Sequence, residues 1–67
     1  NTRWIIDYKY AHPIAGQTIK TFTANMIDRY RDQLHHYASL LRGIEDYPIR
    51  CGLYLPRVPL FIEIPDR

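Results

Sequence analysis

The sequence predicts a small α/β or α+β domain in which one helix packs on a short sheet, in the order strand, helix, strand, strand. Two observations predict this class. One apolar run near the start and two near the end have the length and β-branched content of strands. Between them lies a long segment whose apolar residues recur every three or four positions, as they do on one face of a helix.

The first predicted strand covers residues 4–8, a nearly continuous apolar run with two isoleucines. Such a run is typical of a strand that is covered on both faces, and we expect it to be buried. Residues 11–18 contain proline and glycine and should form a loop or turn. Residues 18–22 alternate weakly between polar and apolar, which favours a short edge strand or an extended loop.

The helix is predicted over residues 25–41. Asn25, followed by Asp28, resembles a helix start, where a capping side chain and a nearby acid are favourable. Gly43 resembles a stop signal, because glycine readily adopts the left-handed conformation that ends many helices. The expected apolar stripe consists of Ile27, Tyr30, Leu34, Tyr37, Ala38 and Leu41.

The second and third strands are predicted over residues 49–55 and 58–64. The link at Pro56 is short enough for a hairpin. Because Pro59 has no N–H for a β-ladder, the last strand should lie at an edge or start after this proline. Its side chains should alternate, Phe61 and Glu63 on one face and Ile62 and Ile64 on the other.

Length and composition limit the chain to one small domain. A 67-residue domain is only marginally stable without a disulfide or metal, and the single Cys51 cannot form an internal disulfide. The net charge of +2 is compatible with nucleic acid but does not argue for it. Neither a signal peptide nor an apolar run of membrane-spanning length is visible, so we expect no membrane partner and a cytoplasmic location.

An acid and a lysine at the end of the first strand are the main candidates for chemistry. Residues i and i+2 of a strand share a face, so Asp7 and Lys9 can converge on one phosphate while the Tyr8 side chain points away. Asp7 and the backbone carbonyl of Tyr8 would supply oxygen ligands for Mg²⁺, and Lys9 would position the attacking water. The alternative is an ordinary polar end to a strand, because D-x-K is a common pattern.

Gln33 and Tyr37 are the second candidate pair. They lie four residues apart and should share one side of the helix, where the glutamine could bind a carboxylate, a water or a phosphate oxygen. Tyr37 could hold the glutamine or contact the DNA backbone. The alternative is a solvated glutamine beside a tyrosine that belongs to the core.

These two motifs in this order resemble the nuclease domain of the RecB family, part of the PD-(D/E)xK superfamily. The likeness lies in D-Y-K after two isoleucines (residues 5–9) and in Q-L-x-x-Y (residues 33–37) on the following helix. The domain occurs in exonuclease V beta subunits, AddA/AddB subunits and UvrD/Rep-type helicase–nucleases. The resemblance covers residues 3–64.

The resemblance implies a restriction-endonuclease-like mixed sheet flanked by helices, of which this chain would hold the incomplete C-terminal part. It implies that Asp7 is a metal ligand, that Lys9 is the catalytic lysine, and that Gln33 and Tyr37 line the site. The expected cofactor is Mg²⁺, with Mn²⁺ as the alternative. The expected partners are DNA and a helicase domain of the same parent chain or complex, in DNA repair and recombination.

One departure from the family pattern concerns the metal ligands. The family has a further aspartate on an earlier strand, and too few residues precede Trp4 to hold it. We therefore expect residues 1–67 to be one partial domain of a longer exonuclease-type hydrolase, itself inactive or nearly so. The loss of a neighbouring strand should also let the fragment self-associate. The alternative functions are a non-catalytic nucleic-acid-binding or assembly module of the same fold and an α/β domain unrelated to DNA.

Overall fold

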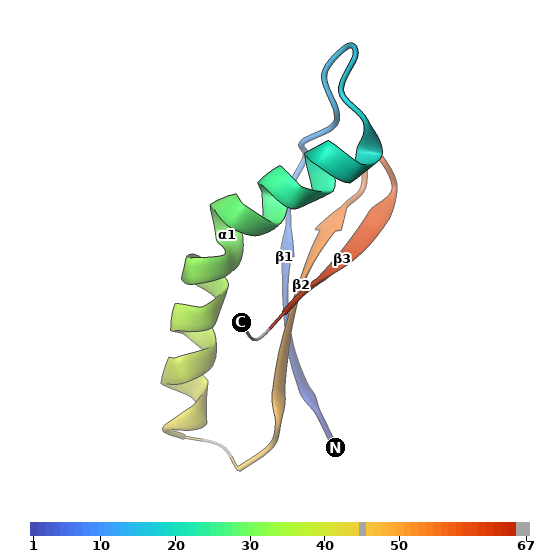
Figure 1. The fold of residues 1–67 in the computed structure, drawn as a ribbon. Coiled ribbons are helices and arrows are strands. Elements are labelled where there is room, and N and C mark those ends of the chain that lie inside the picture. The colour runs from blue at the N-terminus through green and yellow to red at the C-terminus, as the bar shows by residue number, and fades with distance from the viewer. Residues whose placement is uncertain (45, 66–67) are drawn as a thin grey trace.

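The computed structural model describes residues 1–44 and 46–65 and has the predicted order of strand, helix, strand, strand. The three strands form one sheet in the order β1-β2-β3, in which β1 is parallel and β3 antiparallel to β2. Helix α1 connects the two parallel strands and runs back along the sheet (Figure 1). The predicted α+β class is confirmed. The elements are β1 (Arg3–Tyr8), α1 (Ile19–Arg42), β2 (Ile49–Leu55) and β3 (Leu60–Ile64).

The helix begins earlier than the sequence predicts. Thr18 is its N-cap, and the Thr18 hydroxyl oxygen accepts a hydrogen bond from the Thr21 N–H at 3.1 Å. This bond satisfies one of the donors that the first turn leaves unpaired, so the capped helix outweighs the extended preference of the β-branched residues. The expectation of a strand or loop over residues 18–22 was therefore wrong. Phe22 and Met26 are buried and extend the apolar stripe toward the start of α1.

The end of α1 also differs in detail. The helix ends at Arg42, next to the predicted stop, but Gly43 has a φ of −74° and stays in the right-handed region. The last turn tightens instead, because the Ile44 N–H donates to the Leu41 carbonyl at 2.9 Å. The predicted left-handed ending was wrong.

The core lies between α1 and the strand at the centre of the sheet. Leu34 and Ala38 from the helix and Leu53 and Leu55 from β2 are all at most 1% exposed. Tyr37 is 46% exposed, so its expected place in the apolar stripe was wrong. The buried hydrophobic residues that form this core in the described part of the chain are Phe22, Met26, Leu34, Ala38, Ile49, Cys51, Leu53, Leu55, Ile62 and Ile64.

The second and third strands agree closely with the sequence. β2 has the predicted bounds, and β3 starts at Leu60, directly after the proline that cannot join the ladder. The predicted hairpin is confirmed by the antiparallel pairing of the two strands. In β3, Ile62 and Ile64 are buried while Phe61 and Glu63 are exposed, as the alternation predicts.

The two faces of the sheet differ in how far they are covered by other elements, and the difference is clearest in the exposure of the β1 side chains. Trp4, Ile6 and Tyr8 are 38%, 44% and 60% exposed, whereas Ile5 packs against the core. The prediction that the whole first strand is buried was wrong, because α1 covers one face and no described element covers the other (Figure 1). We call the uncovered side the open face, formed by Trp4, Ile6, Tyr8, Arg50, Gly52, Tyr54, Phe61 and Glu63.

Aromatic rings pack against one another across the open face. The Trp4 and Phe61 rings meet edge to face with their centroids 5.7 Å apart. Phe61 reaches Trp4 by lying across Gly52, where any Cβ would collide with the phenyl ring. Arg50 binds Glu63 through two hydrogen bonds of 2.5 and 2.6 Å, so the charges on this face are paired. The open face therefore combines aromatic and apolar side chains with one ion pair and is close to neutral.

Replacement of Leu34 by alanine should lower the free energy of unfolding by about 2–5 kcal/mol, because it leaves a cavity at the centre of the core. Leu40→Ala is the matched control on the same helix, and with Leu40 57% exposed its effect should stay within about 0.5 kcal/mol. Urea unfolding followed by circular dichroism measures both. Equal losses for the two variants would contradict the assigned buried face of α1.

Candidate functional site

Asp7 and Lys9 share the face of β1 that α1 covers. The Lys9 Nζ lies 3.2 Å from Oδ2 of Asp7, and both side chains are less than one-third exposed. Lys9 follows β1, yet its N–H still donates to the Tyr54 carbonyl of β2 at 3.0 Å, so the extended geometry continues through this residue. The Tyr8 side chain lies on the open face against Tyr54, with ring centroids 5.6 Å apart. The alternation of side chains expected for residues 7–9 is confirmed.

Tyr30 joins this pair from the helix. The Lys9 Nζ lies 4.5 Å from the centroid of the Tyr30 ring, within the range of a cation–π interaction. The Arg29 guanidinium lies 5.8 Å from the same ring. The apolar periodicity predicts Tyr30 only as part of the core stripe and does not reveal this contact. The available signal was spacing, because Tyr30 precedes Gln33 by three residues and Tyr37 by seven, which puts all three along one side of a helix.

Gln33 and Tyr37 contact each other, as their spacing predicts. The Gln33 amide lies 3.5 Å from the Tyr37 hydroxyl, a distance at the outer limit of a hydrogen bond, and both side chains are exposed. In the described part of the chain, no hydrogen bond or ion pair joins these two residues to Asp7 or Lys9.

The helix nevertheless carries Gln33 on the side of β1. His35 Nε2 lies 2.7 Å from the Pro65 carbonyl, just beyond β3, so His35 marks the β3 side of α1. Two helix residues correspond to about 200° of rotation, which turns Gln33 to the opposite side. Helix α1 runs antiparallel to β1 (Figure 1).

The oxygen atoms near Asp7 fit a hard divalent cation in part. The N–H groups of Arg3 and Lys9 both donate to the β2 side, so the backbone groups of the even-numbered residues point to the outer edge of β1. The Tyr8 carbonyl thus points toward this edge, one residue after Asp7. Carboxylate and carbonyl oxygens with water are ligands that Mg²⁺ accepts. Within residues 1–44 and 46–65, no cluster of three or more His, Cys, Asp or Glu residues could hold a metal ion.

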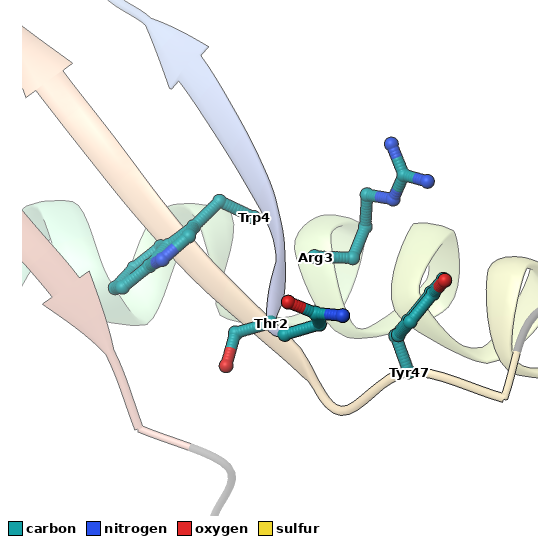
Figure 2. A pocket seen from close by; sticks show the side chains of 5 residues that line it. Thr2, Arg3, Trp4 and Tyr47 are labelled. Atoms are coloured by element: carbon teal, nitrogen blue, oxygen red, sulfur yellow. The ribbon is translucent and has the colours of Figure 1, made fainter.

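A surface pocket lies at the other end of β1. It is lined by Asn1, Thr2, Arg3, Trp4 and Tyr47, and Figure 2 shows Trp4 directed away from Arg3 and Tyr47. None of the candidate residues Asp7, Lys9, Gln33 and Tyr37 lines this pocket.

Comparison of the chain with protein-family models, with curated proteins and with solved structures found no match. No helix within the described residues has the length and apolar character needed to cross a membrane.

The contact between Lys9 and Tyr30 should be measurable as a coupling energy. We expect Lys9→Gln and Tyr30→Leu to be non-additive in unfolding free energy by about 0.5–1 kcal/mol, because each removes one half of a partly buried cation–π contact. Lys20 is exposed at the start of α1, so Lys20→Gln combined with Tyr30→Leu should be additive and serves as the control. If the effects of Lys9→Gln and Tyr30→Leu on the unfolding free energy were also additive, Tyr30 would not belong to the site.

Proposed function

We propose that this chain is part of a metal-dependent DNA nuclease of the RecB type, with a restriction-endonuclease-like fold, in which Asp7 and Lys9 act on a phosphodiester. The observation that carries the proposal is the 3.2 Å contact between the Asp7 carboxylate and the Lys9 ammonium group beneath α1. An acid and a cation held this close at a strand end can act on the same phosphate. The strand–helix–strand–strand order also agrees with the proposal.

Asp7 and the Tyr8 carbonyl would hold Mg²⁺ or Mn²⁺, with further ligands from outside this chain. The ion would supply positive charge and a lowered pKa of bound water. Lys9 would donate hydrogen bonds to the attacking water and to the phosphate oxygen that gains negative charge. Tyr30 supports this role, because its ring holds the Lys9 ammonium group at 4.5 Å and limits the directions in which it can point.

Gln33 and Tyr37 would bind the DNA backbone beside this centre. Their side chains are exposed, and their amide and hydroxyl groups can donate to phosphate oxygens. Arg29 adds positive charge next to the Tyr30 ring. These three groups would position the strand, while its cleavage depends on Asp7 and Lys9. A helicase domain in the longer protein would supply the DNA.

Metal binding by the 67-residue chain is the first test. Addition of Mn²⁺, which prefers the same oxygen ligands as Mg²⁺ but is paramagnetic, should broaden the NMR signals of the backbone amides around residues 7–9 and of the Tyr30 ring. Asp7→Asn should abolish this broadening, because it replaces the charged ligand by a neutral amide of the same shape.

Asp28→Asn is the matched control, since Asp28 is an exposed acid on α1. It should leave the broadening around Asp7 unchanged. Broadening that survives Asp7→Asn, or that centres on the acids of α1, would argue against the proposed metal site.

Cleavage by the longer protein is the second test. Lys9→Ala should lower the rate of Mg²⁺-dependent DNA cleavage by about 10²–10³-fold, because it removes a group that stabilises charge in the transition state. Lys20→Ala removes the other lysine of this chain and should leave the rate within about twofold, because the charge of an exposed residue at the start of α1 is screened by solvent. An unchanged rate for Lys9→Ala would refute the catalytic role.

A non-catalytic assembly module is the second candidate, and the open face supports it. Trp4, Ile6, Tyr8 and Phe61 are all more than one-third exposed, so several large apolar side chains of this face are in contact with solvent. Apolar surfaces of this kind are typical of protein–protein contacts. This candidate predicts that DNA binding, if any, is unaffected by Asp7→Asn and by chelators.

A further inference from the structure

Among the described residues, no strand pairs with the outer edge of β1, so this edge presents backbone groups without a β-ladder partner. β1 lies at one end of the sheet order, and its odd-numbered residues direct their N–H groups toward β2 at both ends of the strand. The N–H and carbonyl groups of Trp4, Ile6 and Tyr8 consequently point away from the sheet. An edge with several outward donors and acceptors in a row is a template for another strand.

We propose that the occupant of this edge is β1 of a second copy of the chain, paired antiparallel about a two-fold axis at Ile5. In this register Arg3 of each copy lies opposite Asp7 of the other, so two pairs of opposite charge form. Trp4 lies opposite Ile6 of the second copy, and their outward backbone groups face each other. The charges of β1 are thus complementary to themselves, which is the requirement for a symmetric dimer.

Backbone geometry and charge exclude the neighbouring registers. A slip of one residue would set the outward groups of one strand against the inward-facing residues of the other, and the ladder could not form. A slip of two residues in one direction puts Arg3 opposite Lys9, two like charges. A slip of two in the other direction puts Arg3 opposite Ile5 and shortens the paired region. The register at Ile5 alone combines full pairing with opposite charges.

The proposed pairing also extends the open face. Trp4 and Ile6 of each copy, which are 38% and 44% exposed, would cover each other across the new strand pair. Tyr8 would lie opposite Thr2, which lines the pocket of Figure 2. The contact is confined to one strand per copy, so it belongs to the class of small, weak interfaces.

Charge reversal tests the register directly. Sedimentation at chain concentrations from about 10 µM to about 1 mM should show a concentration-dependent dimer for the unchanged chain. Arg3→Asp and Asp7→Arg should each raise the dimer dissociation constant about tenfold, because each sets two pairs of like charge against each other. An equimolar mixture of the two variants should dimerise as well as the unchanged chain, since both cross-strand pairs are again opposite in sign.

The controls separate this effect from net charge and from unfolding. Arg57→Asp, in the exposed turn between β2 and β3, makes the same change of charge as Arg3→Asp and should leave the dimer unaffected. Circular dichroism verifies that each variant is folded, and the mixture tests the pairing even where one variant is less stable. Asp7→Arg removes a proposed metal ligand, whereas Arg3→Asp leaves the proposed ligands unchanged. Arg3→Asp is therefore the variant that separates loss of the dimer from loss of metal binding.

Cross-linking reports the register independently. The cross-linking variants carry Cys51→Ala so that the introduced cysteine is the only one. In Ile5→Cys, the cysteines of the two copies lie opposite each other at a Cα separation of about 4.5 Å, which a disulfide can span. It should therefore oxidise to a covalent dimer faster than Ile6→Cys. A monomer at every concentration, a dimer insensitive to Arg3→Asp, failure of the mixture to recover, or faster cross-linking by Ile6→Cys would each overturn the proposal. A dimer lost with Phe61→Asn but not with Arg3→Asp would assign the contact to the open face instead.

Discussion

The packing of α1 on one face of a three-stranded sheet is the constraint on which the other features depend. Leu34 and Ala38 meet Leu53 and Leu55 at the centre of this contact, all at most 1% exposed. Because the helix covers only one face, successive side chains of β1 alternate between the face under α1 and the face exposed to solvent. The covered side receives the acid and the lysine, and the uncovered side receives the aromatic residues.

This division gives the candidate site its chemical character. Lys9 lies between a carboxylate at 3.2 Å and an aromatic ring at 4.5 Å, so its ammonium group is held from two sides. A group held in this way loses little further freedom when it binds a phosphate, and such preorganisation is what electrostatic catalysis requires. The outer edge of β1 is open for a different reason, because β1 lies at one end of the sheet order, and the charges of β1 suit a second copy of the strand.

Local patterns in the sequence were sufficient for part of the fold. The bounds of β2, the start of β3 after Pro59 and the shared face of Asp7 and Lys9 follow from the composition of short segments and the two-residue repeat of strands. The start of α1 was missed because the β-branched residues after Thr18 favour an extended chain, and the hydroxyl cap competes with that preference only in the folded helix.

Features that depend on two distant elements could not be predicted in this way. The exposure of Trp4 and Ile6 depends on whether a second layer covers the sheet, which an apolar run does not reveal. The contact of Tyr30 with Lys9 depends on how α1 is placed over β1. Gln33 and Tyr37 share a side of the helix as predicted, but among the described residues no hydrogen bond or ion pair joins them to Asp7 or Lys9, and their spacing alone could not reveal this.

The central claim is that the Asp7 carboxylate and the Tyr8 carbonyl bind a divalent cation beside Lys9. A crystal of this chain soaked in Mn²⁺ and measured at the manganese absorption edge tests it most directly. The account predicts an anomalous difference peak at coordinating distance from both oxygens, about 2.0–2.3 Å. A well-ordered β1 with no peak there, or with manganese bound only to the acids of α1, would contradict it.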